Sequence, residues 1–130
     1  MHLTRQTDIA IAALIHATQA KGCLVRISTI ANSYGTSVAQ AAQATRRLTQ
    51  LGWLDSHRGR GGGLTLASNA ERLSLAQIVD TLQPARRDRA PPSRAIDVLL
   101  NQAEQSRLAC LDRYTLRDLA DSRFPHHHPT

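Results

Sequence analysis

Aromatic residues are scarce in this chain of 130 residues, in which phenylalanine, tryptophan and tyrosine together make up 3%. Cores of β-sandwiches and barrels rely on aromatic and β-branched side chains, so the shortage favours helices packed through smaller apolar residues. Hydrophobic residues account for 42% of the sequence, which suffices for a modest core. The length fits one domain with a helical extension.

Other absences narrow the possible functions. The sequence has no apolar run long enough to span a membrane and no recognisable signal peptide, so we expect a cytoplasmic protein. Its two cysteines, Cys23 and Cys110, are expected to be thiols in a reducing compartment. It also lacks a nucleophile–base pair, a credible pair of catalytic carboxylates and a phosphate loop, so an enzyme is not expected.

The charge balance favours a nucleic-acid partner. The sequence contains sixteen lysines and arginines and ten acidic residues, which gives a formal net charge of +6. All sixteen basic residues except Lys21 are arginine. The planar guanidinium fork binds phosphates and guanine edges. A rival interpretation, a protein-interaction subunit that regulates a partner enzyme, is disfavoured by this charge but stays open.

Six segments carry helix signals, each preceded by a hydroxyl residue that can cap its N-terminus. The first predicted helix is capped by Thr4 or Thr7 and ends at about residue 20. The other predicted helices, each with its capping residue, are 29–34 (Ser28), 38–51 (Ser37), 75–82 (Ser74), 94–112 (Ser93) and 116–120 (Thr115). A turn at Gly35 joins the second and third helices, as in a helix-turn-helix.

A glycine-rich segment, Arg58 to Gly63, lies between two short stretches with strand character and predicts a β-hairpin. Helix, turn, helix and basic hairpin follow in the order of a winged helix-turn-helix, which places one helix in the major groove of DNA. The expected fold class is therefore mainly α with a small β-hairpin and a long C-terminal dimerisation helix.

The third helix is predicted to read bases, because glutamine and arginine bond to adenine and guanine edges. Its inward face is expected to hold Val38, Ala41, Ala42, Leu48 and Leu51. The complete predicted DNA-binding set is Thr4, Ser28, Ser37, Gln40, Gln43, Arg46, Arg47, Arg58, Arg60, Gly61 and Gly62. The alternative for the helix side chains is an ordinary solvated surface.

The long helix over 94–112 has apolar residues spaced by three and four, which predicts pairing with a second copy. The predicted interface comprises Ile96, Leu99, Leu100, Ala103, Cys110 and Leu111. A homodimer is expected to bind double-stranded DNA whose half-sites are two-fold related. Cys110 is interpreted as a small buried residue; the alternative is a redox switch that uses Cys110 or Cys23.

Residues 84–93, with three prolines and three arginines, predict a linker between units 1–83 and 94–121. The linker arginines are either solvated or an additional contact to DNA or an effector. Residues 122–130 are expected to form a flexible tail, and His126–His128 are expected to bind metal only adventitiously. No metal site is predicted, and the sequence does not indicate which small-molecule effector, if any, the protein binds.

Several motifs together resemble the Rrf-two family of bacterial winged-helix regulators, from Met1 to about Asp121. The wing over 58–66 is similar to the family's Arg-Gly-x-x-Gly-Gly-x-x-Leu signature. The other matching motifs are Leu3-Thr4 with Thr7-Asp8, Leu51-Gly52-Trp53-Leu54, Ile78-Val79, and Tyr114-Thr115-Leu116-x-Asp118-Leu119. The motif at the start of the chain, Leu3-Thr4 with Thr7-Asp8, is closer to the NsrR branch. The resemblance implies a DNA-binding transcriptional regulator, usually a repressor.

One departure concerns the family's cofactor. Cluster-binding members carry three cysteines between the fourth helix and the dimer helix, and some NsrR-like members add a carboxylate at the position of Asp8. Residues 84–93 contain no cysteine here. Because a cluster needs thiolates or substitute ligands, we expect no iron–sulfur cluster and no other cofactor.

The protein is therefore expected to be colourless when it is purified anaerobically. A visible absorption spectrum and an iron assay measure this directly. A brown preparation that contains iron would contradict the interpretation of residues 84–93.

Overall fold

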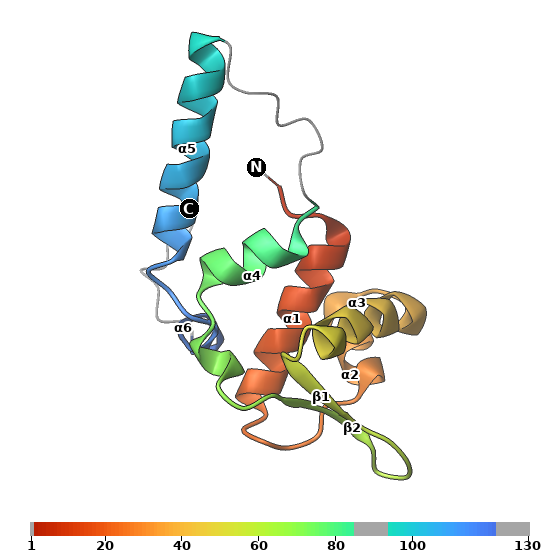
Figure 1. Ribbon diagram of the computed structural model, residues 1–130. Helices are drawn as coiled ribbons and strands as arrows, with labels where there is room; N and C mark the ends of the chain where they lie inside the picture. Colours follow the sequence, from red (N-terminus) through yellow and green to blue (C-terminus); the bar gives the residue numbers. More distant parts are fainter. Residues whose placement is uncertain (1, 85–93, 122–130) are drawn as a thin grey trace, which may run out of the picture.

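The computed structural model of the protein describes residues 2–84 and 94–121. Its elements are α1 (Arg5–Gln19), α2 (Ile27–Tyr34), α3 (Val38–Gln50), β1 (Leu54–His57), β2 (Gly63–Leu66), the 3-10 turn η1 (Ala70–Arg72), α4 (Leu75–Leu82), α5 (Ala95–Leu111) and α6 (Leu116–Ala120). Within these residues, helices with one hairpin confirm the expected class, mainly α with a small β-hairpin (Figure 1). The predictions for Ser93, for residues 85–93 and for the tail with His126–His128 lie outside the described residues.

Helix α1 is the centre of the domain, and α2, α3 and α6 pack around it. Thr4 caps α1, because its hydroxyl accepts a 3.2 Å hydrogen bond from the backbone N–H of Thr7. The buried apolar face of α1 combines small and branched residues: Ile9, Ala10, Ala13, Leu14 and Ala17. Alanines at these positions let neighbouring helices approach closely, so a core poor in aromatics is still well packed.

The helix-turn-helix consists of α2 and α3. Helix α2 ends at Gly35, whose φ of 85° lies in the left-handed region that favours glycine. As predicted, Ser37 caps α3 by accepting a 3.1 Å bond from the N–H of Gln40. The predicted cap at Ser28 is wrong, since α2 begins at Ile27. Backbone pairing of Val25 with Leu64 ends the extended segment earlier than the sequence indicated, so Ser28 lies in the first turn.

The buried face of α3 differs in part from the expected one. Ala41 and Leu48 are fully buried as predicted, and Ala44 and Thr45 join them. Val38 and Leu51 were expected to point inward, but their exposed fractions are 54% and 38%. Both lie at the ends of the helix, where the core no longer covers them.

The wing is the antiparallel pair β1–β2, with Leu54 opposite Leu66 and His57 opposite Gly63. Two 2.8 Å backbone hydrogen bonds between Val25 and Leu64 attach it to the chain just before α2. At Gly62 an added Cβ would lie 2.3 Å from the carbonyl oxygen of His57, so the tip needs glycine there.

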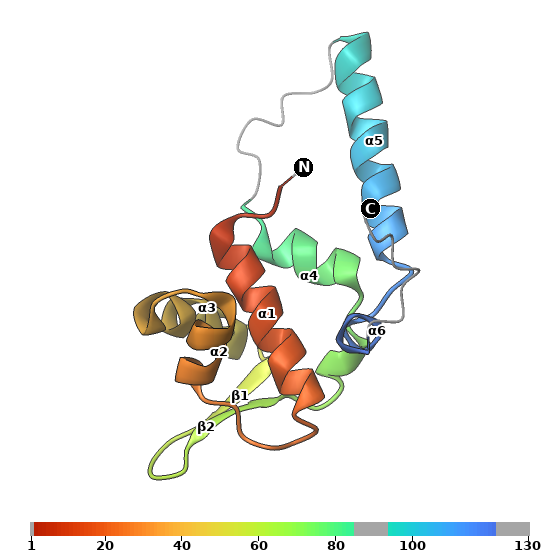
Figure 2. The ribbon, with the colours of Figure 1, turned by 180° about the vertical axis from the view of Figure 1, so that it is seen from behind.

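The two C-terminal helices behave differently. Helix α5 extends away from the domain, whereas α6 returns and packs against α1 (Figures 1 and 2). Leu116 is fully buried, and its N–H donates a 2.9 Å bond to the carbonyl of Leu73. Helix α6, which lies beyond the predicted linker, therefore contributes to the same hydrophobic core as the winged helix-turn-helix. Among the described residues, none of the helices combines the length and apolar content that a membrane crossing requires.

Candidate nucleic-acid interface

An outward stripe on α3 presents Ala39, Gln43, Arg46 and Gln50, which recur every three or four residues opposite the buried Ala41 and Leu48. All four residues are exposed. The three polar side chains form no hydrogen bond or ion pair with any described residue. Their donors and acceptors are thus available to a ligand on this face.

Arg47 does not belong to this stripe. Its guanidinium donates hydrogen bonds to the carbonyl oxygens of Leu82 (2.9 Å) and Thr81 (2.8 Å), at the C-terminal end of α4. These carbonyls have no partner within their own helix, and a cation is favourable there. The prediction that Arg47 reads bases is therefore corrected, because two of its guanidinium N–H groups bond to α4 and hold the side chain away from the stripe.

Other predicted residues are also engaged within the chain. The side-chain oxygen of Gln40 accepts a hydrogen bond from the hydroxyl of Thr36. Thr4 acts as the cap of α1 and also donates to the hydroxyl of Thr7 over 2.9 Å. Ser28 and Ser37 are exposed at the first turns of α2 and α3, where backbone N–H groups favour a phosphate.

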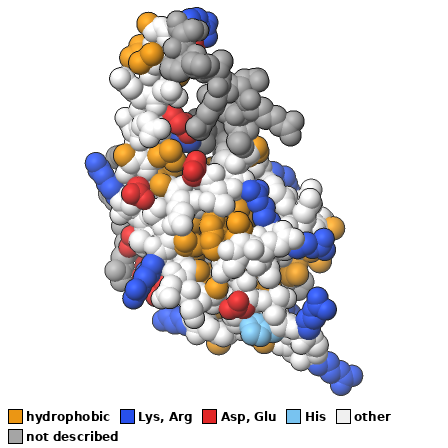
Figure 3. Space-filling view, viewed as in Figure 1, with side chains coloured by type: hydrophobic (Ala, Val, Ile, Leu, Met, Phe, Trp, Pro, Cys, Tyr) orange, Lys and Arg blue, Asp and Glu red, His pale blue; other side chains and the backbone are white. Residues whose placement is uncertain are grey.

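The wing carries Arg58 and Arg60 on its exposed tip, together with Gly61, whose φ is 73°. Neither arginine has a hydrogen bond or ion pair with a described residue. Figure 3 shows basic side chains at the lower right, where the wing projects in Figure 1. The wing thus extends the positively charged surface beyond α3.

A cleft of about 260 Å³ separates the wing from the start of α2. It is lined by Arg26, Ile27, Ser56, His57, Gly62, Gly63 and Leu64. Arg26, which was not among the predicted DNA-binding residues, is exposed and lines this cleft beside the wing. In the sequence, only its position directly before the helix-turn-helix indicates that it could contact DNA. His57 is held across the hairpin by a 2.9 Å hydrogen bond with Thr65.

Asp8, which the family resemblance marks as a possible carboxylate ligand, has a structural partner here. It accepts a 2.8 Å hydrogen bond from the hydroxyl of Tyr34, and the Arg5 guanidinium lies 5.6 Å from the centre of the Tyr34 ring. The hydrogen bond to Asp8, together with desolvation and the charge of Asp8, raises the pKa of Tyr34. These contacts join the start of α1 to the end of α2.

Helix α5 has an apolar face that the single chain leaves uncovered. Ile96, Leu99, Leu100, Ala103 and Cys110 are all exposed, with 59% of Leu99 accessible. Leu111 is different, because it is partly buried and packs against the core of its own chain. Its place in the dimer interface stays a prediction. The expected burial of Cys110 is not seen in the single chain, where Cys23 is exposed as well.

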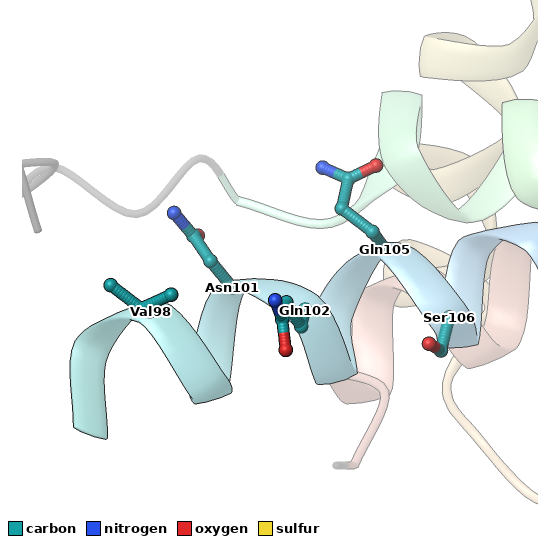
Figure 4. A pocket seen from close by; sticks show the side chains of 5 residues that line it. All are labelled: Val98, Asn101, Gln102, Gln105 and Ser106. Carbon is teal, nitrogen blue, oxygen red and sulfur yellow. The ribbon is translucent and has the colours of Figure 1, made fainter. Parts of the chain in front are cut away.

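The opposite face of α5 is largely polar. It borders a groove of about 520 Å³ lined by Val98, Asn101, Gln102, Gln105 and Ser106 (Figure 4). The helix therefore presents two chemically distinct exposed faces, one aliphatic and one rich in amides.

Comparisons with known proteins identify the family. The Rrf2 family, described as "Iron-dependent Transcriptional regulator", matches residues 3–122. The chain belongs to the Rrf2 family. NsrR of Bacillus subtilis (strain 168), an HTH-type transcriptional regulator, is 33% identical over 135 aligned residues that cover 95% of this chain and 92% of the relative.

Solved structures agree with this assignment. T. potens IscR aligns with a TM-score of 0.78 and 20% identity over 100% of this chain and 93% of its own. The oxidized form of Staphylococcus aureus CymR aligns with a TM-score of 0.76 and 25% identity over 93% of this chain and 97% of its own. The protein is thus an Rrf2 transcriptional regulator with a DNA-binding winged helix, not an enzyme, as the sequence predicted.

The described residues do not group the donors that an iron–sulfur cluster takes. The whole sequence contains two cysteines, and residues 84–93 contain none. No group of three or more His, Cys, Asp or Glu side chains in the described part of the chain could hold a metal ion. The carboxylate of Asp8 is also bonded to Tyr34.

Replacing Arg58 and Arg60 together by alanine is expected to weaken binding to every DNA sequence, because phosphate contacts carry no sequence information. Each lost phosphate contact makes the negative slope of log K against log salt concentration shallower by about 0.9. Titrations of labelled duplexes at several salt concentrations measure this slope. The control replaces Arg94 and Arg113, which are exposed beyond the two ends of α5. An unchanged slope in the wing variant would show that the wing does not contact phosphate.

Proposed function

We propose that this Rrf2 regulator is a homodimeric, sequence-specific repressor that works without an iron–sulfur cluster. The observation that carries the proposal is the outward stripe of α3 next to the arginines of the wing. Both elements project on the same side of the molecule (Figures 1 and 2). One face therefore offers base-reading side chains and phosphate-binding cations together.

Helix α3 enters the major groove in this proposal. Gln43 and Gln50 suit adenine edges, and Arg46 suits a guanine edge or a phosphate. Ala39 lies on the same stripe, and its small side chain lets the helix backbone come close to the bases. The wing then contacts the adjacent minor groove or backbone through Arg58 and Arg60.

The dimer forms through the apolar face of α5. None of the residues of α5 is buried in the single chain. Complete burial of one leucine or isoleucine side chain contributes about 1.5–3 kcal/mol, so covering Ile96, Leu99 and Leu100 favours association. A two-fold axis between paired helices directs the two copies of α3 to half-sites about one helical turn, or a multiple of it, apart.

Repression and the absence of a cluster complete the proposal. A dimer that covers promoter DNA excludes other proteins from it, which makes repression the simplest outcome. The poor fit of this chain's donors to a cluster supports regulation by some other signal than loss or oxidation of iron.

Replacing Leu99 by aspartate is expected to convert the dimer into a monomer, because a buried unpaired carboxylate in the interface is costly. Sedimentation equilibrium measures the change in mass. Val98 provides a matched control, since it is exposed on the opposite face of α5, and its aspartate variant should remain dimeric. A wild-type monomer, or a dimer that survives the Leu99 change, would count against this interface.

Fragments selected from genomic DNA by the purified protein should contain a motif with two-fold symmetry. Gln43→Ala should alter the base preference at one or two pairs in each half-site, because a bidentate contact contributes about 1–3 kcal/mol of discrimination. Repeating the selection with the variant measures this, and Gln102→Ala on α5 serves as the control. An unchanged preference would remove Gln43 from the set of base readers.

A further inference from the structure

We propose that Arg47 is a positioning residue, which fixes the rotation of α3 about its own axis by anchoring this helix to the end of α4. The inference rests on the proposed reading of DNA by α3. It assigns specificity to a side chain that does not itself contact DNA.

The anchor has a directional geometry. Two nitrogens of the Arg47 guanidinium each donate to a different carbonyl, Leu82 at 2.9 Å and Thr81 at 2.8 Å. Because the guanidinium is planar and rigid, two such bonds fix its direction as well as its position. The hydroxyl of Thr7 donates to the same Leu82 oxygen at 3.3 Å, so α1 and α3 meet at one carbonyl.

The end of α4 is itself held in place. The side chain of Gln83 accepts a 3.1 Å bond from the N–H of Thr4 and donates a 3.3 Å bond to the carbonyl of His2. Leu82 is buried in the hydrophobic core. Arg47 therefore connects α3 to a point that is fixed by the start of α1 and by the core.

Helix α3 needs such a constraint because of how it packs. Two of its four buried residues are Ala41 and Ala44, which have no side-chain atoms beyond Cβ. Small residues permit close approach, but they provide few ridges to interlock with the grooves of a neighbouring helix and resist rotation. The bonds of Arg47 supply the missing directional contact.

The consequence differs for two kinds of DNA contact. Base contacts require correct placement of several side chains at once, whereas phosphate contacts are less sensitive to orientation and independent of sequence. Rotation of α3 moves the stripe of Gln43, Arg46 and Gln50 sideways. Loss of the anchor should therefore reduce operator affinity and leave non-specific affinity in place.

Two variants test this inference. Arg47→Lys keeps the charge but loses the planar fork, and Arg47→Met loses both. We expect each to lower affinity for the selected operator about tenfold, with the Lys variant retaining wild-type affinity and salt dependence on non-specific DNA. The preferred base at each position should stay the same, while discrimination weakens over several positions instead of being lost at one. Arg46→Met is the matched control, because the adjacent Arg46 faces outward. This variant should make the dependence of log K on log salt concentration shallower or alter a base preference.

Thermal unfolding followed by circular dichroism verifies that each variant is folded, and the lysine variant decides the matter if the methionine variant unfolds. The inference fails if Arg47→Lys binds like the wild type while Arg47→Met weakens binding to all DNA, since Arg47 then contacts phosphate. A changed preference at a single base pair would also overturn it. If Arg46→Met and Gln43→Ala have no effect either, it is the proposed reading by α3 that fails.

Discussion

Close packing of small side chains against α1 is the constraint on which the rest of the structure depends. Ala13 and Ala17 of α1 and Ala41 and Ala44 of α3 are almost completely buried, so the helices approach closely without aromatic residues. This packing leaves the opposite face of α3 exposed. Helix α6 also packs against α1 and buries Leu116 in the core, so the C-terminal helix lies against the domain.

Packing through alanine brings helices together but defines their rotation weakly, and polar contacts at the periphery supply the direction. Arg47 bonds to the end of α4, and Tyr34 bonds to Asp8 across α1 and α2. Gln19 of α1 donates a 3.0 Å bond to the carbonyl of Ala120 in α6. The core thus determines which helices meet, and the surface bonds determine how they are oriented.

The arginines divide by their surroundings. Arg94, Arg107 and Arg117 form ion pairs with acidic side chains, and Arg47 is bound by carbonyls. By contrast, Arg46 on α3 and the arginines of the wing have no such partner among the described residues. Composition alone suggested a nucleic-acid partner, but only the structure separates arginines that stabilise the chain from those available to bind DNA.

The sequence by itself determined the features that depend on near neighbours. The caps at Ser37, Ser74 and Thr115 bond to an N–H three residues ahead, and the stop at Gly35 depends on one backbone conformation. The glycine-rich wing was recognisable for the same reason. Such local contacts depend only on residues that are close together in the sequence, so the order of the elements and the fold class could be predicted from them.

Only the tertiary structure decided which side of each helix is used. Arg46 and Arg47 are adjacent and chemically identical, yet the partners of Arg47 lie 34 and 35 residues further along the chain. Likewise, Val38 is exposed and Leu111 packs, partly buried, against the core of its own chain because of which elements lie beside them. The reason is physical: the environment of a helix face is set by distant segments brought together on folding, and the spacing of residues indicates it only in part.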